Sequence, residues 1–130
     1  MRLECLPVDD LVPHEQIEPA RLEFAVRWVR SLKRFDSPIW VDEATRVILD
    51  GHHRWHAFRI LGHAHIPCFL VDYHAPEITL APRREGVAVS KALVLERALS
   101  GALFPYKTTR HTFPPVETAS FELPCAPSGA

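Results

Sequence analysis

The sequence predicts a small α+β domain, and three observations lead to this prediction. The chain has 130 residues, 47% of them hydrophobic and 24% charged, and a chain of this length buries about two-thirds of the surface that it exposes when unfolded. Apolar residues recur at helical spacing in some segments and form short β-branched runs in others. Along the chain the elements follow the order helix, strand, strand, helix, strand, helix, which differs from the regular alternation of a doubly wound fold.

The first half of the chain contains one helix and two short strands. Residues 19–34 are predicted as a helix because a proline follows Glu18 at the first helical position and apolar residues then recur every three or four positions. Pro38 ends this helix. Two β-branched runs at residues 39–41 and 47–49 predict a hairpin or two adjacent strands.

The second half repeats this mixture of elements. A helix is predicted over residues 52–61, and a strand follows at residues 66–73. A weaker strand is expected near residues 78–80. The last helix is predicted over residues 91–100, because Ser90 is a good N-cap.

The composition changes near the C-terminus. Residues 114–130 contain four prolines and only scattered apolar side chains. We therefore predict one domain over residues 1–113 and a flexible tail over residues 114–130, in which Phe121 and Leu123 are the side chains able to dock.

Charge and cysteine content exclude several classes of protein. Fifteen basic and 16 acidic side chains give a formal net charge of −1, so the broad basic surface of a duplex-binding protein is missing and no nucleic-acid partner is expected. The three cysteines show neither paired nor metal-binding spacing. Without a leader or an apolar spanning segment, the sequence predicts free thiols, a cytoplasmic location and no membrane partner.

A dense polar cluster follows the second predicted strand, where residues 50–54 read Asp-Gly-His-His-Arg. The first turn of a helix offers free N–H groups to an anion, Gly51 permits close approach, and Arg54 can clamp phosphate oxygens. Asp50 would then face the phosphates, which is costly unless it holds a divalent cation. The same residues are equally typical of a plain turn with histidines in solvent, and the residue types leave both interpretations open.

Zinc hydrolysis is a third interpretation of this cluster. His52 and His56 lie four residues apart on one helical face, as in some zinc sites. The glutamate that acts as base in those sites is missing, and Arg54 places a cation beside the metal. We therefore disfavour zinc.

Two further segments carry polar groups suited to chemistry. Residues 107–111 read Lys-Thr-Thr-Arg-His and combine positive charges with hydroxyl groups. Glu15 lies in a polar loop before the first helix. Taken singly, both segments are also typical of solvated loops.

Together, P-H-E-Q at residues 13–16, V-I-L-D-G-H-H-R-W at 47–55 and K-T-T-R-H at 107–111 closely resemble the free L-serine kinases of the ParB/sulfiredoxin superfamily. The resemblance spans residues 11–113 and implies a compact single-domain ParB/sulfiredoxin-like fold, with a small mixed sheet flanked by helices. In ParB proteins and sulfiredoxins the strand-to-helix turn carries a G-E-R-R or a G-C-H-R box. Here G-H-H-R occupies that position, without the sulfiredoxin cysteine.

The resemblance implies a kinase that transfers a phosphoryl group from a nucleotide to the hydroxyl of free L-serine, giving O-phospho-L-serine. ATP is favoured over ADP as the donor, with Mg²⁺. Glu15 matches the family's general base and, with His53, would contact the amino acid. Asp50 matches the family's essential aspartate and is the candidate magnesium ligand. The implied nucleotide and phosphate ligands are Gly51, His52, His53, Arg54, Lys107, Thr108, Thr109, Arg110 and His111.

One departure from the family concerns the acceptor. The family carries a tryptophan near the substrate pocket after the third strand, whereas residues 79–84 here read Thr-Leu-Ala-Pro-Arg-Arg. The expected partners are therefore a nucleotide and a small hydroxy amino acid, serine or a larger one. The alternative function is a nucleotide-binding ParB-like regulatory module without kinase turnover. The sequence does not predict the oligomeric state.

Overall fold

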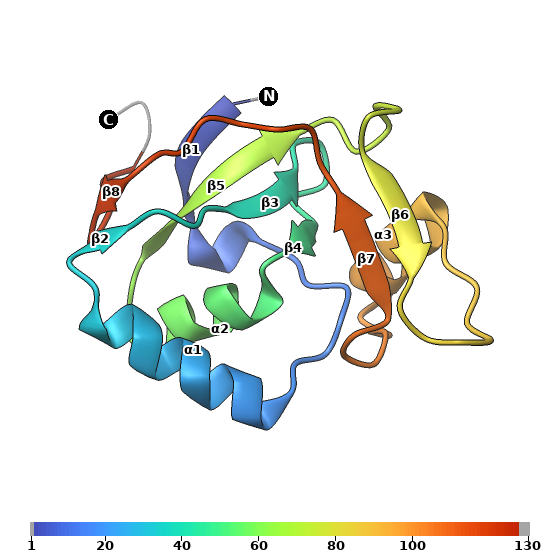
Figure 1. Cartoon of the computed structure of the whole chain (residues 1–130), viewed down its shortest axis with the longest axis horizontal. Coiled ribbons are helices and arrows are strands. Elements are labelled where there is room, and N and C mark those ends of the chain that lie inside the picture. Colours follow the sequence, from blue (N-terminus) through green and yellow to red (C-terminus); the bar gives the residue numbers. More distant parts are fainter. Residues whose placement is uncertain (1, 128–130) are drawn as a thin grey trace.

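A mixed four-stranded sheet lies at the centre of the computed structural model, which describes residues 2–127 (Figure 1). Its strands follow the order β1-β5-β3-β4, with bounds Arg2–Pro7, His65–Val71, Ile39–Asp42 and Ile48–Asp50. β3 runs parallel to β5, whereas the β1–β5 and β3–β4 pairs are antiparallel. The predicted α+β class with a small mixed sheet is confirmed.

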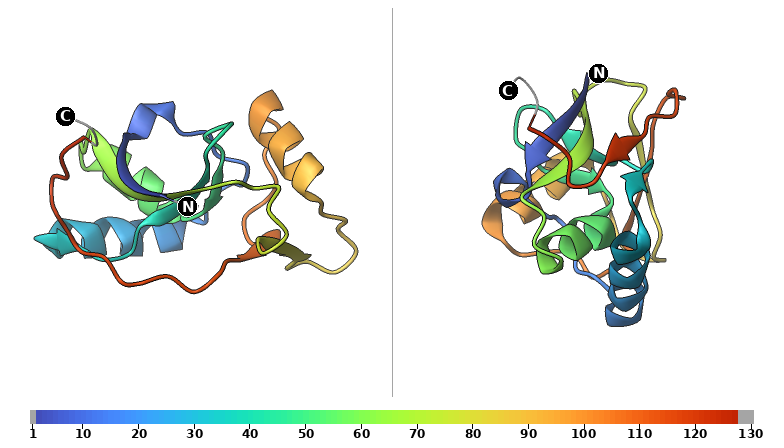
Figure 2. Two further views of the ribbon diagram at one scale, coloured as in Figure 1. Left: turned by 90° about the horizontal axis from the view of Figure 1, so that it is seen from above. Right: turned by 90° about the vertical axis from the view of Figure 1, so that its left-hand side faces the viewer.

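Two helices pack together against this sheet, as Figures 1 and 2 show. α1 spans Pro19–Ser31 and α2 spans His52–Ile60. α1 stops short of the predicted residue 34 because Leu32 is already extended. The core beneath the helices contains the following buried side chains: Val29, Phe35, Ile39, Phe58, Ile66 and Leu70. No helix among the described residues is long and apolar enough to cross a bilayer.

A second core forms on the far side of β4. The 3-10 turn Val8–Asp10 precedes the loop that reaches this region, and α3 (Lys91–Ser100) packs there beside the antiparallel pair β6 (Thr79–Pro82) and β7 (Thr109–Thr112). These elements lie together at one end of the molecule (Figure 1). The core that they enclose contains Leu49, Tyr73, Ile78, Val94, Ala98 and Phe104.

The segment after β7 returns across the molecule to the opposite end (Figure 1). Phe113 stacks on Trp40 with ring centroids 4.1 Å apart, and β8 (Phe121–Glu122) pairs with β2 (Arg34–Phe35). Leu123 packs against the first core, and Cys125 is buried. The described part of the expected tail is thus packed against the protein through its few apolar side chains. Residues 128–130 lie outside the described residues.

Four strands were not predicted from the sequence, namely β1, β2, β7 and β8, and the two longer ones, β1 and β7, show why. β1 carries charged residues at Arg2 and Glu4, which interrupt its apolar pattern, yet all six of its residues pair with β5. β7 reads Thr-Arg-His-Thr and has no apolar residue, so its strand character comes from pairing with β6. In both cases cross-strand hydrogen bonding decides the conformation.

The loop before α1 is held between two elements. Val12 bridges to Val47 next to β4, and Glu15 bridges to Phe104 after α3. The backbone N–H of Gln16 donates to the Phe104 carbonyl at 2.8 Å, and the N–H of Phe104 donates to the His14 carbonyl at 2.9 Å. This loop is therefore as firmly placed as a strand.

Replacing Gly51 with alanine should destabilise the fold. Gly51 has φ +109°, and an added Cβ would lie 2.3 Å from Cγ2 of Ile39, a core residue. Overpacking together with the strained backbone predicts a loss of about 2–4 kcal/mol, measured by urea unfolding. Gly62→Ala is the matched control, because Gly62 has φ +80° but an added Cβ meets nothing within 4 Å. Equal losses in both variants would show that the contact with Ile39 is irrelevant.

Candidate active site

A cavity of about 200 Å³ opens between the start of α2, the loop before α1 and the segment leading into β7. Its walls are polar and carry both signs of charge. The lining residues are Glu15, Arg21, Leu49, Asp50, Gly51, His52, His53, Arg54, Arg83, Lys107 and Thr109.

Glu15 is the most firmly held side chain of this cavity. Its Oε1 accepts from the backbone N–H of Lys107 at 2.7 Å. Its Oε2 accepts from the backbone N–H of Thr109 at 3.1 Å and from the Thr109 hydroxyl at 2.7 Å. Two N–H groups two residues apart that point at one anion form a backbone nest, and Lys107 adopts the left-handed φ of 57° in this turn. The carboxylate is therefore fixed in position at the cavity wall.

The N-terminus of α2 forms the opposite wall. Gly51 precedes the helix, so the N–H groups of its first turn are directed toward the cavity. Asp50 lies beside this turn with a side chain that is 55% exposed, and its Oδ2 is 3.5 Å from Nη2 of Arg54. The helix start can therefore bind an anion, and the Asp50 carboxylate, paired with Arg54, lies beside it.

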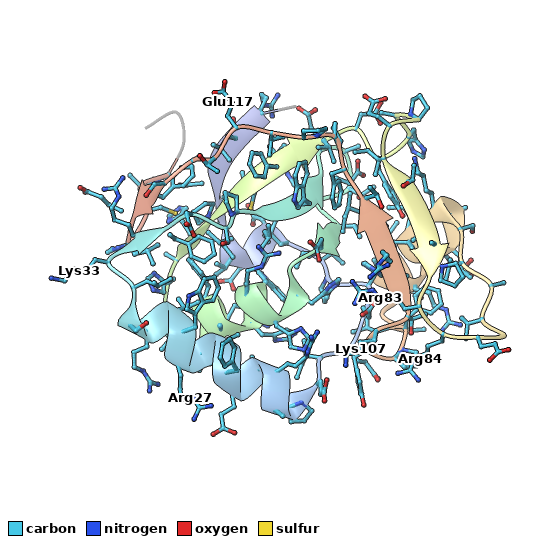
Figure 3. All side chains as sticks on the ribbon, viewed as in Figure 1. Arg27, Lys33, Arg83, Arg84, Lys107 and Glu117 are labelled. Atoms are coloured by element: carbon cyan, nitrogen blue, oxygen red, sulfur yellow. The ribbon has the colours of Figure 1, made fainter. Side chains whose placement is uncertain are left out.

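Four basic side chains surround the two carboxylates. Arg54 is tied by a 2.8 Å hydrogen bond from Nη1 to the Ser37 carbonyl, and Nζ of Lys107 lies 3.7 Å from Glu18. Arg83 and Lys107 approach the cavity from the same end of the molecule, whereas Arg27 and Lys33 point away from it (Figure 3). With Arg21, which also lines the cavity, these side chains can neutralise several negative charges on a ligand.

Two histidines of the predicted cluster use one ring nitrogen to hold the backbone. Nε2 of His52 accepts from the N–H of His14 at 3.2 Å, and Nε2 of His53 accepts from the N–H of Glu18 at 2.9 Å. Among the described residues, neither Nδ1 has a hydrogen-bond partner. Both rings can therefore position the loop before α1 and still offer a second nitrogen to a ligand.

Buried histidines form the floor behind the cavity. The His14 ring is fully buried and lies edge-on to His52 and His111, with centroids 4.6 Å and 5.7 Å away. Burial lowers the pKa of His14 and, well below its usual value, the pKa of His52. Burial, with His14 and two basic side chains, lowers the pKa of His111 to about 3. At neutral pH this floor is uncharged.

Most of the predicted site residues meet in this cavity. Those that line it are Glu15, Asp50, Gly51, His52, His53, Arg54, Lys107 and Thr109. Thr108, Arg110 and His111 are not among its lining residues. Thr108 is buried and donates to the Pro105 carbonyl, Arg110 is exposed, and His111 contacts the hydroxyl of Tyr73 at 2.7 Å. Alternation along β7 separates Arg110 from Thr109.

Three lining residues were missed, namely Arg21, Leu49 and Arg83. Arg21 lies in the first turn of α1 and Arg83 directly follows β6. Basic residues at such positions are usually solvated. These two are recognised as cavity residues only because the fold brings α1 and the end of β6 to the same cavity. Leu49 precedes the predicted cluster and contributes an apolar wall.

The acidic and histidine side chains of the cavity meet the requirements of Mg²⁺ but not those of Zn²⁺. Among the described residues there is no group of three or more His, Cys, Asp or Glu side chains that could hold a metal ion, which is what a zinc site needs. Mg²⁺ takes one or two carboxylates and completes its shell with water and phosphate oxygens. The exposed carboxylate of Asp50 fits that requirement.

Comparison with known proteins adds a family context. No family model matches the chain. An ATP-dependent L-serine kinase from Desulfurococcus mucosus is 37% identical over 97 residues, which are 72% of this chain and 38% of that protein. An ADP-dependent L-serine kinase from Thermococcus kodakarensis is 30% identical over 77 residues, which are 56% of this chain and 32% of that protein. The chain thus spans less than two fifths of the length of either relative.

A solved structure decides the fold. A free serine kinase in complex with AMP superposes with a TM-score of 0.83, over 93% of this chain and 92% of that chain. The chain has the fold of the free serine kinases. At 16% identity the free serine kinase structure establishes the architecture alone, and the sequence relatives point to the same group of proteins. The expected resemblance is confirmed.

The buried histidines predict that stability falls as pH is lowered. An unfolded histidine titrates near pH 6.5, while the pKa of folded His111 is about 3. The unfolded chain therefore binds more protons below pH 6.5, and this stability, complete above pH 6.5, is lost toward pH 3. His111→Gln should reduce the slope below pH 6 by up to about 1.4 kcal/mol per pH unit, measured by urea unfolding at pH 7, 6 and 5. The exposed His74 gives the control His74→Gln, and an equal change of slope there would contradict the assignment.

Proposed function

We propose that the chain is a nucleotide-dependent kinase that phosphorylates the hydroxyl of free L-serine. The observation that carries this proposal is the position of Glu15, a fixed carboxylate in the same cavity as the α2 N-terminus and four basic side chains. Phosphoryl transfer needs alignment and charge neutralisation more than covalent chemistry. The relatives named ATP- and ADP-dependent L-serine kinases support serine as the acceptor.

The reaction assigns a role to each wall of the cavity. Glu15 accepts the proton as the serine O–H bond breaks, and the serine oxygen forms a bond to the terminal phosphorus. The bond from that phosphorus to its bridging oxygen breaks, and the shortened nucleotide leaves with the electron pair. The first turn of α2, Arg54, Arg83 and Lys107 hold the phosphate oxygens. Mg²⁺, bound by Asp50, would supply further charge neutralisation. We propose ATP as the donor, as in the D. mucosus relative.

An adjoining groove has the character of a nucleobase site. The cavity of about 200 Å³ is too small for a whole nucleotide, because pockets for ligands of that size measure about 300–1,000 Å³. A more apolar groove of about 420 Å³ shares Arg21, His53 and Arg54 with it and adds Phe24 and Trp28 from α1. Phosphates in the cavity and a base on this groove together accommodate the donor.

Glu15→Gln should abolish turnover and leave nucleotide affinity within about threefold. The amide oxygen can still accept from one of the two backbone N–H groups, but the amide cannot take the substrate proton, so the rate should fall by about 10²–10⁴-fold. The assay is mass detection of O-phospho-L-serine from serine, ATP and Mg²⁺, with ADP as a parallel donor. Glu117→Gln, at an exposed position (Figure 3), controls for loss of one carboxylate.

The outcomes of this assay separate the possible functions. Product from the Glu15→Gln protein at the parent rate would remove Glu15 as the base. Product from another hydroxy amino acid but not from serine would revise the acceptor. Nucleotide binding with no product from the parent protein would favour a nucleotide-binding regulatory module without turnover, as the 35% identical ParB-like protein of Sulfolobus acidocaldarius also allows.

Phe24→Ala should weaken nucleotide binding. Phe24 is 64% exposed in the apolar groove, and loss of one base–aromatic stack costs about 1–3 kcal/mol, so the Kd should rise about tenfold or more. Calorimetry with a non-hydrolysable ATP analogue measures this change. Leu99→Ala is the matched control, since Leu99 is 65% exposed on α3. Unchanged affinity in Phe24→Ala would place the base elsewhere.

A further inference from the structure

Three side chains form a continuous line from the cavity into the protein interior. Oε2 of Glu15 lies 2.7 Å from the Thr109 hydroxyl oxygen, which lies 2.9 Å from Nε2 of His14. On the far side of the ring, Nδ1 of His14 lies 2.7 Å from the Ile48 carbonyl oxygen. Glu15 lines the cavity, whereas His14 is completely buried.

The contacts among Glu15, Thr109 and His14 need one more hydrogen than these three side chains carry when His14 is neutral. A carbonyl oxygen only accepts, so Nδ1 of His14 carries a hydrogen, and Nε2 of a neutral His14 is an acceptor. The single hydroxyl hydrogen of Thr109 is then flanked by two acceptors, Nε2 of His14 and Oε2 of Glu15. One added proton, placed on either the imidazole or the carboxyl group, completes both hydrogen bonds.

The surroundings of His14 keep its ring neutral until a proton is delivered. Burial lowers the pKa of His14, while the Ile48 carbonyl, Glu15 and Asp50 act in the opposite direction. His52 of α2 and His111 of β7 face the ring. His111 in turn contacts the Tyr73 hydroxyl at 2.7 Å, and the positive charges of Lys91 and Arg83 act on it. Oε2 of Glu15 lies 3.8 Å from Nε2 of His14, so an imidazolium here is paired with Glu15.

We propose that Glu15, Thr109 and His14 form a proton relay, in which His14 is the final acceptor of the proton that Glu15 takes from the substrate hydroxyl. This proposal rests on the kinase function proposed above. The substrate O–H bond breaks and an O–H bond forms on Glu15. That proton passes from Oε2 to Oγ1 of Thr109 while the original Thr109 hydrogen passes to Nε2 of His14. Glu15 is again an anion, and His14 is an imidazolium.

The relay has a chemical purpose and a return path. The imidazolium of His14 is stabilised by the Glu15 anion 3.8 Å away, and the proton on it is held away from the newly formed phosphate ester. When product leaves and water enters the cavity, the proton returns through Thr109 and Glu15 to solvent. His14 acts through Glu15 and is therefore a positioning residue.

The first test reads the protons directly and needs no turnover. Ring nitrogen NMR of the uniformly ¹⁵N-labelled chain at neutral pH should show His14 with hydrogen on Nδ1 and none on Nε2. Glu15→Gln should lower the pH at which Nε2 gains its proton by about one unit, because the stabilising anion is gone. Thr109→Val should alter the His14 titration, and Thr109→Ser should restore it. A His14 that carries hydrogen on Nε2 at neutral pH, or titrates alike in all four proteins, would overturn the relay.

The second test reads the transfer step in single-turnover quench experiments. The parent rate should fall at low pH with the midpoint that NMR gives for His14. Thr109→Val should slow transfer by about 10- to 100-fold and lose that midpoint, with substrate KM changed less than the rate, whereas Thr109→Ser should stay within about threefold. Thr112→Val, an exposed position on the same strand, should match the parent.

The two tests separate failure of the relay from failure of the kinase proposal. An inactive parent protein would refute the kinase function, while the NMR titration still decides whether the three residues share a proton. An active parent in which Thr109→Val keeps both its rate and its acid midpoint would overturn the relay alone.

Discussion

The hydrogen bonds from the turn at residues 107–109 to the Glu15 carboxylate hold the site together. They join segments that are 92 and 94 residues apart in sequence, and they fix the side chain that we propose as the base. Hydrogen bonds to an ionised acceptor are among the stronger ones in proteins. The same turn leads into β7. The hydrogen bonds to Glu15 therefore fix the cavity wall and also the position of the strand that packs beside the second core. Without them, the loop before α1 would keep its contacts with Phe104 and with the Thr109 hydroxyl but lose those with the backbone of the 107–109 turn.

The electrostatics of the cavity follow from what surrounds that carboxylate. The α2 N-terminus and four basic side chains favour the binding of anions, while the carboxylates of Glu15 and Asp50 offset part of this positive charge. Behind them, the largely buried rings of His14, His52 and His111 form an uncharged floor. Interactions that face such a floor are screened less than those in water. A site of this kind can bind phosphates and still take up a proton, which is what a kinase for a hydroxyl acceptor requires.

Local sequence patterns were reliable where one element carries the information. The strand-turn-helix of residues 48–54 and the helix from Lys91 to Ser100 are present as predicted, because capping, glycine and apolar period act over a few residues. The segment 107–111 was predicted as a set of phosphate-binding side chains. In the structure its backbone N–H groups bind Glu15, the Thr108 hydroxyl binds a carbonyl, and Arg110 is exposed. Backbone donors have no sequence pattern, so this use could not be predicted.

The sequence alone predicted the α+β class and the three helices, and its resemblance to a known family implied that Glu15, Asp50 and Arg54 belong to one site. Only the tertiary structure decided which of these groups face one another. Arg21 and Arg83 reach the cavity from α1 and from the residue after β6, and His14 meets Thr109 across 95 residues. The physical reason is that local propensities act along the chain, whereas hydrogen bonds and charge pairs depend on distances in space that the packing of two cores sets.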